Sequence, residues 1–339
     1  MAPTNSYDQY DQMNFQGRDM ILLRSIAGML SAGLAVLGAG MVSAQDYPSK
    51  TIRLFTSTVG GSNDLASRLI APMLSGHLGQ QVIVDNRPGV IAIEAVAKAS
   101  PDGYALLLYG NVTWLDPLMR DKPLWDPIKD FSPITLTHSA PNILVVHPSL
   151  PVKSVKELIA LAKARPGELN VSTGAIGGSP HLASELFKSM AGVNIVHILY
   201  KGTGPAVNDV IAGHVQVNFS TPGPVAPHIK SGRLRALAVT SAEPSALAPG
   251  LPTMAASGLP GYEAAAMSGI LAPAKTPAVI INRLNQGLLQ ILNKAETKEK
   301  FFNLGMEPVS NSPDQFAAAI RSQMVRMGKV IKDAGIRVK

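Results

Sequence analysis

The sequence predicts an α/β protein made of two lobes, each built on a sheet covered by helices. Three observations lead to this class. Short apolar segments with strand character alternate with amphipathic segments of helical period from residue 51 onward. Apolar residues make up 46% of the 339 residues, which is enough for sizeable cores, and only 16% are charged, so a disordered body is not expected. The length suits two domains of ordinary size without excluding one.

The first part of the chain shows the alternation clearly. The segment Ser62–Leu78 carries Leu65, Leu69 and Met73 at helical spacing, so we expect a helix there. Around it we expect strands at Thr51–Ser57, Gln81–Asp85, Tyr104–Tyr109 and Asn142–Val146, and a helix at Ile91–Ala99.

The rest of the chain continues the pattern and ends in helices. Ser154–Ala164 is amphipathic, with Ser154 as N-cap and Glu157 at the capping-box position. We expect strands at Leu169–Thr173, Ile195–Ile198, Val215–Phe219 and Leu234–Val239, and helices at Ser179–Met190, Pro205–Ile211, Pro277–Lys294, Thr297–Leu304 and Pro313–Ala334.

The mostly apolar strands predict parallel sheets covered on both faces. We expect the first lobe to comprise residues 45–146 together with the returning segment 263–339, and the second lobe to comprise residues 147–262. The helical end of the chain carries too few strands for a third domain, so it is expected to pack on the first lobe.

The amino-terminal segment has the layout of a secretory signal peptide. Arg18 and Arg24 precede an apolar run of small residues from Ile26 to Val42, and Ser43 and Ala44 follow. We expect residues 1–44 to be removed by cleavage after Ala44, with the true start at Met1, Met13 or Met20. The alternative is a membrane anchor, for which the run is at the lower length limit.

Composition excludes several classes of chemistry. The chain has no cysteine, so disulfides, thiolate catalysis, cysteine zinc sites and lipid attachment to cysteine are ruled out. The formal net charge is +7, but the basic residues are scattered and aromatic residues make up only 5%, so nucleic-acid binding is not expected.

Three strand-to-helix turns share one composition of Gly with Ser, Thr or Asn. They are Ser57–Asp64, Tyr109–Thr113 and Ser172–His181. In open α/β sheets, ligands bind at such turns, where helix amino-terminal N–H groups and hydroxyls favour an anion. Together the turns predict a neutral cradle for a carboxylate. The alternative for each turn is that it only ends a strand and caps a helix.

Individual side chains near these turns have competing interpretations. Asp64 either belongs to the site or complements the dipole of the following helix. Trp114 either lines a pocket or packs in a core. His181 and Glu185 share a helix face, but a metal needs further ligands, so we expect no metal site.

Signatures of catalysis are missing from the sequence. It contains no GxSxG nucleophile elbow, no P-loop and no GxGxxG dinucleotide loop. The sequence therefore favours binding over turnover and predicts no cofactor. A secreted hydrolase that uses Ser179 with His181 is the distant alternative, and a structural surface protein is another.

A long series of motifs resembles the Bug-type extracytoplasmic receptors, the TctC-like component of tripartite tricarboxylate transporters. Gly60–Arg68 (GGSNDLASR) follows the pattern GG-x-x-D-x-x-A-R of that family, except that Ser67 stands where the pattern has Ala. Further matches lie in order at Tyr47–Leu54, Gly79–Gly89, Glu94–Tyr104, Asp126–Thr135, Val145–Asn170, Gly177–Gly192, Tyr200–Phe219, His228–Ser241, Leu251–Glu263 and Leu271–Pro277. The resemblance covers essentially all of residues 47–339.

The resemblance implies a type II periplasmic-binding-protein-like α/β fold with a ligand cleft between two lobes. It also implies that the loops hold ligand carboxylates through backbone amides, hydroxyls and bridging waters. The implied ligand-binding residues are Thr58, Gly61, Ser62, Asn63, Asn111, Thr113, Thr173, Gly177, Gly178 and Ser179. Asp64 of the first loop is added to them as a candidate from the residue pattern. The first loop departs from the usual family pattern Pro-Phe-x-Pro-Gly-Gly, so a familiar solute cannot be transferred to this chain.

The expected function is that of a monomeric periplasmic receptor. It would capture a di- or tricarboxylate, an amino acid or an aromatic acid by cleft closure and deliver it to the membrane permease subunits of a tripartite transporter. The alternative within binding proteins is a sensory receptor that presents its ligand-bound form to a signalling partner.

Overall fold

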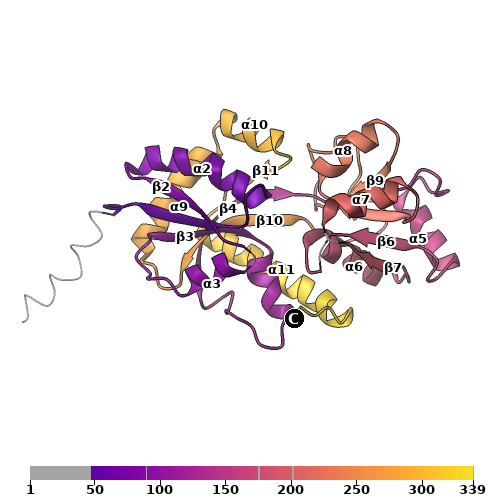
Figure 1. Ribbon diagram of the computed structural model, residues 1–339, viewed down its shortest axis with the longest axis horizontal. Coiled ribbons are helices and arrows are strands. Elements are labelled where there is room, and N and C mark those ends of the chain that lie inside the picture. The colour runs from indigo at the N-terminus through magenta and orange to yellow at the C-terminus, as the bar shows by residue number, and fades with distance from the viewer. Residues whose placement is uncertain (1–46, 89, 175, 201, 339) are drawn as a thin grey trace, which may run out of the picture. The chain divides into compact units, whose positions relative to one another are not determined.

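The computed structural model describes residues 47–88, 90–174, 176–200 and 202–338. The predicted signal peptide at residues 1–44 lies outside the described residues. From Lys50 onward the chain forms one compact unit, in which the helices and strands gather around two separate sheets (Figure 1). In the described part of the chain, no helix has the length and apolar character needed to cross a membrane.

The first lobe is built on a six-stranded sheet in the order β11-β4-β10-β3-β1-β2. Its strands are β1 (Ile52–Thr56), β2 (Val82–Asn86), β3 (Ala105–Gly110), β4 (Phe131–Ala140), β10 (Ala266–Pro273) and β11 (Glu307–Pro308). Its helices are α2 (Ser62–Leu78), α3 (Ile91–Ala97), α4 (Val112–Leu115), the 3-10 helix η2 (Asp116–Met119), α9 (Ala278–Leu292), α10 (Ala295–Asn303) and α11 (Pro313–Asp333).

The second lobe is built on a five-stranded sheet in the order β7-β6-β8-β5-β9. Its strands are β5 (Ile143–Val146), β6 (Asn170–Thr173), β7 (Val196–Leu199), β8 (Val217–Ser220) and β9 (Arg235–Val239). Its helices are α5 (Val155–Ala164), α6 (Ser179–Ala191), α7 (Thr203–Ile211) and α8 (Pro222–Lys230). The two-lobe α/β fold expected from the sequence is confirmed.

The expectation of parallel sheets is wrong in part, because both sheets are mixed. Strands β1, β2 and β3 run parallel, and so do β6, β7 and β8. Strand β10 is antiparallel to β3 and β4, and β5 is antiparallel to β8 and β9. The reason lies in the chain path: β4 leads out of the first lobe and β10 leads back into it, so these neighbours run in opposite directions.

Six elements were not predicted from the sequence: strands β4, β10 and β11, helices α4 and α8, and the 3-10 helix η2. Strands β4 and β10 were not predicted, since β4 carries polar residues such as Thr135, Thr137 and His138 at buried positions. Helix α8 was also missed because it contains three prolines, although Pro222 at its first position suits the start of a helix.

The predicted lobe boundaries stay a prediction, and the strand pairing bears on one of them. Strand β5, which the sequence assigned to the first lobe, pairs with β8 and β9 of the second sheet. This pairing favours a first crossover that ends before Ile143.

The two crossovers between the lobes lie side by side. The backbone N–H of Asn142 donates to Thr240 Oγ1 at 2.8 Å, and the N–H of Thr240 donates back to the Asn142 carbonyl at 2.9 Å. The N–H of Ala264 donates to the Thr240 carbonyl at 2.8 Å. The chain therefore leaves and re-enters the first lobe through one hydrogen-bonded strip.

Local sequence signals account for several element ends. Ser154 caps α5 by accepting a hydrogen bond from the Glu157 N–H, as the sequence predicted. The Glu157 carboxylate accepts from the N–H of Lys153 rather than from that of Ser154. Helix α2 ends at Leu78, and its C-cap Gly79 has a φ of 71°, a left-handed conformation that glycine adopts without strain.

Candidate functional site

A cavity of about 340 Å³ receives residues from both lobes. Five of the eleven predicted ligand-binding residues line it: Ser62, Asn63, Asn111, Gly177 and Ser179. The other lining residues are Gly110, Val112, His138, Ala140, Thr221, Gly223, Pro224, Ala266, Ser268, Leu304, Gly305 and Met306. The structure therefore brings all three predicted loops to one place.

The amino-terminal ends of three helices face this cavity. Helix α2 begins at Ser62, α6 begins at Ser179, and α8 begins at Pro222 between the lining residues Thr221 and Gly223. None of the three has a side-chain hydrogen bond at its N-cap. The positive ends of their dipoles are thus directed at the cavity, together with the N–H groups of their first turns, except at Pro180, Pro222 and Pro224, which have no N–H.

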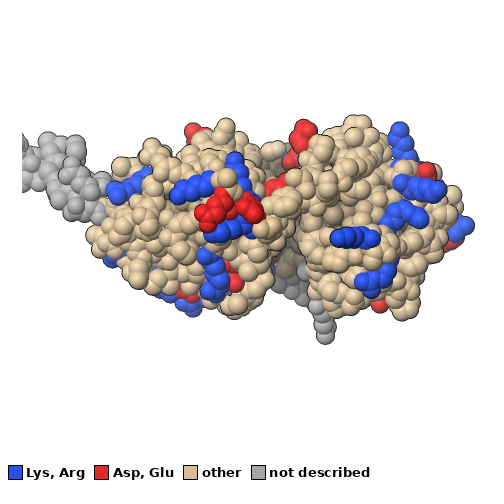
Figure 2. All heavy atoms as spheres, turned by 90° about the horizontal axis from the view of Figure 1, so that it is seen from above, with Lys and Arg blue, Asp and Glu red and all other residues tan. Residues whose placement is uncertain are grey.

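The cavity walls carry no formal charge among the residues that the structure describes, apart from the ionisable His138. Elsewhere, Lys and Arg side chains are dispersed over the face shown in Figure 2, with Asp and Glu among them. An anion in this cavity would be held by backbone N–H groups, hydroxyls and amides, which matches the neutral cradle expected from the sequence.

Six predicted site residues do not line the cavity. Gly61 and Gly178 are the N-cap residues of α2 and α6, and so adjoin it. The side chain of Thr58 is exposed. Thr113 is buried, and its hydroxyl has no partner among the described residues. Thr173 is buried and its hydroxyl lies 2.5 Å from His197 Nε2.

The sixth residue is Asp64, whose carboxylate is bonded to other residues of the first lobe. Its oxygens accept from the N–H of Gly60 at 2.9 Å and from the amide of Asn86 at 2.8 Å, and they pair with Arg68 at 2.9 Å. Burial opposes ionisation, but these hydrogen bonds outweigh it and lower the pKa of Asp64. The contacts favour the interpretation of Asp64 as a residue that fixes the first loop.

Two asparagines tie the site to the crossovers. Asn111 Oδ1 accepts from the N–H of Met267 at 2.7 Å. Asn142 Nδ2 donates to Ser179 Oγ at 2.8 Å and to the carbonyl of Ala264 at 3.0 Å. These bonds link the second and third loops to the segments that join the lobes.

Ser179 and His181 do not form a catalytic pair. Ser179 Oγ accepts from Asn142, and His181 Nδ1 accepts from the N–H of Gly177 at 3.0 Å. A base must reach the hydroxyl of its nucleophile. The geometry therefore gives no support to the hydrolase alternative.

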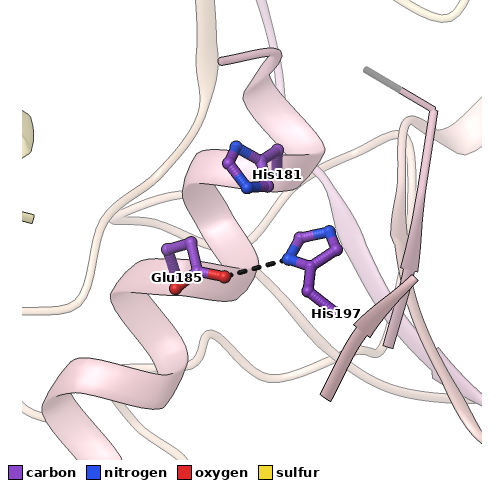
Figure 3. Close-up of side chains that lie close together, drawn as sticks. All are labelled: His181, Glu185 and His197. Carbon is purple, nitrogen blue, oxygen red and sulfur yellow. Dashed lines mark hydrogen bonds and ion pairs between the residues drawn. The ribbon is translucent and has the colours of Figure 1, made fainter. Parts of the chain in front are cut away.

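A cluster of three ionisable side chains lies behind the third loop (Figure 3). His181 and Glu185 lie one turn apart on α6, and His197 faces them from β7, with its Nδ1 2.9 Å from Glu185 Oε1. Sequence reasoning missed His197 because it belongs to a separate strand.

These three residues offer a possible metal-ligand set, and their ligand atoms lie within 4.8 Å of one another. However, Lys188 Nζ lies 2.9 Å from Glu185 Oε1, so a cation already pairs with this carboxylate. His181 Nδ1 is also engaged by Gly177. Together these contacts form a hydrogen-bonded charge cluster behind the third loop.

Other lining residues were missed for different reasons. Thr221 and Gly223 follow a predicted strand, so the strand-to-helix rule could have found them. His138 on β4 and Ser268 on β10 had no signal, because neither strand was predicted.

Acidification is expected to destabilise the protein through its buried ionisable groups. Burial lowers the pKa of His138 to about 4. Burial first, and then the nearby His197, lower that of His181 to about 4. The unfolded chain therefore binds protons at these positions before the folded protein does, and the free energy of unfolding falls as the pH falls from 6.5 to about 4. His138 alone accounts for about 3 kcal/mol of this fall in the free energy of unfolding.

Glu185 extends this dependence to lower pH. Its burial would raise the pKa, but hydrogen bonds from His197 and Lys188 outweigh burial and lower it to about 2. The stability that it contributes is present above about pH 4.5 and is lost as the pH falls toward 2.

Urea unfolding at pH 7, 5.5 and 4 tests the contribution of His138. The free energy of unfolding should fall less steeply with falling pH in His138→Phe than in the wild type. The exposed variant His214→Gln should keep the wild-type slope, and an unchanged slope in His138→Phe would contradict the prediction.

The fold and the site define a class of protein: an α/β solute-binding protein whose two lobes share a cavity lined by helix amino-termini. The chain belongs to the tripartite tricarboxylate transporter family of receptors (TctC), whose family model matches residues 66–336. The resemblance seen in the sequence is thereby confirmed.

Relatives of known sequence and structure agree with this assignment. The chain is 36% identical over 328 residues to protein BugT of Bordetella pertussis, covering 95% of this chain and 100% of that protein. Among solved structures it is similar to Rpa4515 of R. palustris with adipate (37% identity, TM-score 0.73, 86% of this chain and 99% of that one). It is also similar to the periplasmic binding protein BugD, with 30% identity and a TM-score of 0.70 over 86% of this chain and 100% of that one. A further similar structure is MatC of Rhodopseudomonas palustris with bound malate, with 25% identity and a TM-score of 0.69 over 84% of this chain and 100% of that one.

Proposed function

We propose that this protein is a periplasmic solute-binding protein that captures a small carboxylate between its two lobes and does not turn it over. The observation that carries the proposal is the set of three helix amino-termini at one cavity whose walls offer neutral donors. Relatives with bound adipate and malate support a carboxylate as the solute class.

We further propose that capture works by closure of the lobes and serves delivery to a tripartite transporter. The hydrogen-bonded strip of Asn142, Thr240 and Ala264 is a natural hinge, because both crossovers pass through it. Bound solute would contact helix ends of both lobes only in the closed form, and this difference in contacts would favour closure. Family membership supports permease subunits as the partner, and the signal-peptide layout with cleavage after Ala44 supports the periplasm.

Thermal unfolding of the purified, ligand-free protein tests the solute class. A panel of di- and tricarboxylates, amino acids and aromatic acids is added at millimolar concentration. A solute at 100 times its Kd should stabilise the folded protein by about 2.7 kcal/mol, so one chemical group should raise the midpoint clearly. A midpoint that no acid in the panel changes would argue against a carboxylate receptor.

Placing a carboxylate in the cradle should weaken solute binding. In Ser62→Glu, a negative charge at the start of α2 competes with the solute for the same N–H groups, and affinity should fall at least about tenfold. The folded protein should stay stable, because an acid suits the first turn of a helix. Isothermal titration of the best acid measures the effect. The exposed α11 variant Ser322→Glu is the matched control and should bind as the wild type does.

A further inference from the structure

His138 stands out among the lining residues because it is an ionisable residue in the wall of a cavity that is otherwise neutral. It is only 3% exposed, and its ring packs against that of Phe301 with centroids 5.7 Å apart. It lies in a row across three neighbouring strands, since Ser268 pairs with His138 on β4 and with Gly110 on β3. Both of these neighbours also line the cavity.

An irregularity in β4 sets the position of His138. Strand β10 pairs Ser268 with His138 but pairs the next residue, Gly269, with Leu136. Thr137 is therefore an extra residue on β4, as in a β-bulge, and bulges redirect the side chains beside them. Thr137 Oγ1 lies 3.0 Å from His138 Nδ1 and 3.1 Å from the carbonyl oxygen of Ser268.

The hydrogen bonds of Thr137 decide which ring nitrogen of His138 carries the proton. A hydroxyl has one hydrogen. If Thr137 gives it to the Ser268 carbonyl, the imidazole must donate from Nδ1 to Thr137 Oγ1, and all three groups are satisfied. If Thr137 instead gives it to Nδ1, the buried carbonyl loses this partner. The first arrangement satisfies more buried polar groups and is the stable one.

In this tautomer Nε2 carries a lone pair and no hydrogen. Nε2 makes no hydrogen bond with any residue that the structure describes. Because burial keeps the ring neutral at pH 7, Nε2 repels a carboxylate oxygen and attracts a donor. The helix ends of α2, α6 and α8 favour an anion at the same cavity, so the solute there needs both kinds of group.

We propose that His138 is a specificity-determining residue that accepts a hydrogen bond from a hydroxyl or ammonium group of the solute. The preferred solute is then a hydroxy- or amino-substituted carboxylate rather than the unsubstituted acid of the same length. This inference rests on the proposed carboxylate-binding function and narrows it to a substrate class.

Paired acids test the preference directly. Isothermal titration compares malate and aspartate with succinate, and 2-hydroxyadipate with adipate. The wild type should bind the substituted member of a pair about tenfold more tightly, as expected for one hydrogen bond to a buried acceptor. Equal affinity within every pair overturns the role of His138 and leaves the carboxylate receptor standing. If no acid in any of these pairs or in the wider panel binds, the proposed function fails together with the inference.

Variants assign the preference to His138 itself. His138→Leu should reduce the ratio of affinities within a pair to about one, while the unsubstituted acid still binds. His138→Gln, whose side-chain oxygen can accept in place of Nε2, should restore part of the ratio. A ratio that His138→Leu leaves unchanged overturns the proposal.

A spectroscopic measurement keeps the proposal testable should His138→Leu fail to fold. Long-range ¹H–¹⁵N correlation of the wild-type imidazole should show the proton on Nδ1 at neutral pH. Thr137→Val removes the acceptor for that proton, so the tautomer should become mixed and the affinity ratio should fall. A wild-type ring with its proton on Nε2 overturns the proposal.

Discussion

Asn142→Asp is expected to destabilise the protein by about 3–5 kcal/mol, although the two side chains have the same shape. Asn142 is 0% exposed, and its Nδ2 donates to Ser179 Oγ and to the Ala264 carbonyl. An aspartate removes both donors and places a carboxylate against a carbonyl oxygen. Either the charge stays buried without a cation or the group takes up a proton, and both cost stability.

Urea unfolding at pH 7 measures this loss. The matched control is Asn282→Asp on the exposed face of α9, where the same change should alter the free energy of unfolding by no more than about 0.5 kcal/mol. Solute binding should also weaken, because Asn142 positions Ser179 at the cavity and ties the third loop to the crossover strip. A loss equal to that of the control would show that the strip tolerates a charge, and would remove Asn142 from the proposed hinge.

Trp114→Ala is expected to cost about 3–5 kcal/mol of stability through the cavity that it leaves. Trp114 is 0% exposed, packs edge-on against Phe316 with centroids 6.0 Å apart, and donates its indole N–H to Gln323 Oε1 at 2.5 Å. Gln323 in turn donates to the Ala265 carbonyl at 3.3 Å. The residue therefore joins α4, α11 and the second crossover in one core, and does not line the solute cavity.

Two comparisons separate packing from the hydrogen bond. Trp114→Phe keeps most of the ring but leaves Gln323 without its indole donor, so the loss in urea unfolding should be intermediate. Phe302→Ala removes an aromatic ring that is 44% exposed and should cost much less. Normal stability of Trp114→Ala with weakened solute binding would instead place Trp114 in the binding site.

The local sequence pattern was enough to predict most elements and the loops of the site. Helix α2 coincides with its predicted bounds Ser62–Leu78, and Ser154 caps α5 as expected. Such features depend on residues within one or two turns of each other, so periodicity and capping reveal them. The strand-to-helix rule likewise predicted the loops that contain Asn111 and Ser179, and both residues line the cavity.

Partners distant in sequence decided the features that the pattern missed. Strand β4 buries polar side chains because residues far along the chain bond to them: Thr135 Oγ1 donates to the Asn311 carbonyl at 2.9 Å. The sequence leaves open whether Asp64 belongs to the site or to its helix, and the bond from the amide of Asn86 to its carboxylate favours a structural role. A buried polar group needs a donor or acceptor that the fold brings to it. The local sequence pattern does not predict which residue that partner is.

The sequence by itself thus determined the class of fold, the family and the three loops that gather at the cavity. Only the tertiary structure decided the antiparallel course of β4 and β10, the core position of Trp114 and the place of His138 in the cavity wall. The physical reason is the range of the interactions. Helix and strand periods are set by neighbours in the chain, whereas the pairing of β4 with β10 and the bonding of the buried Thr135 and Thr137 are set by residues more than a hundred positions away.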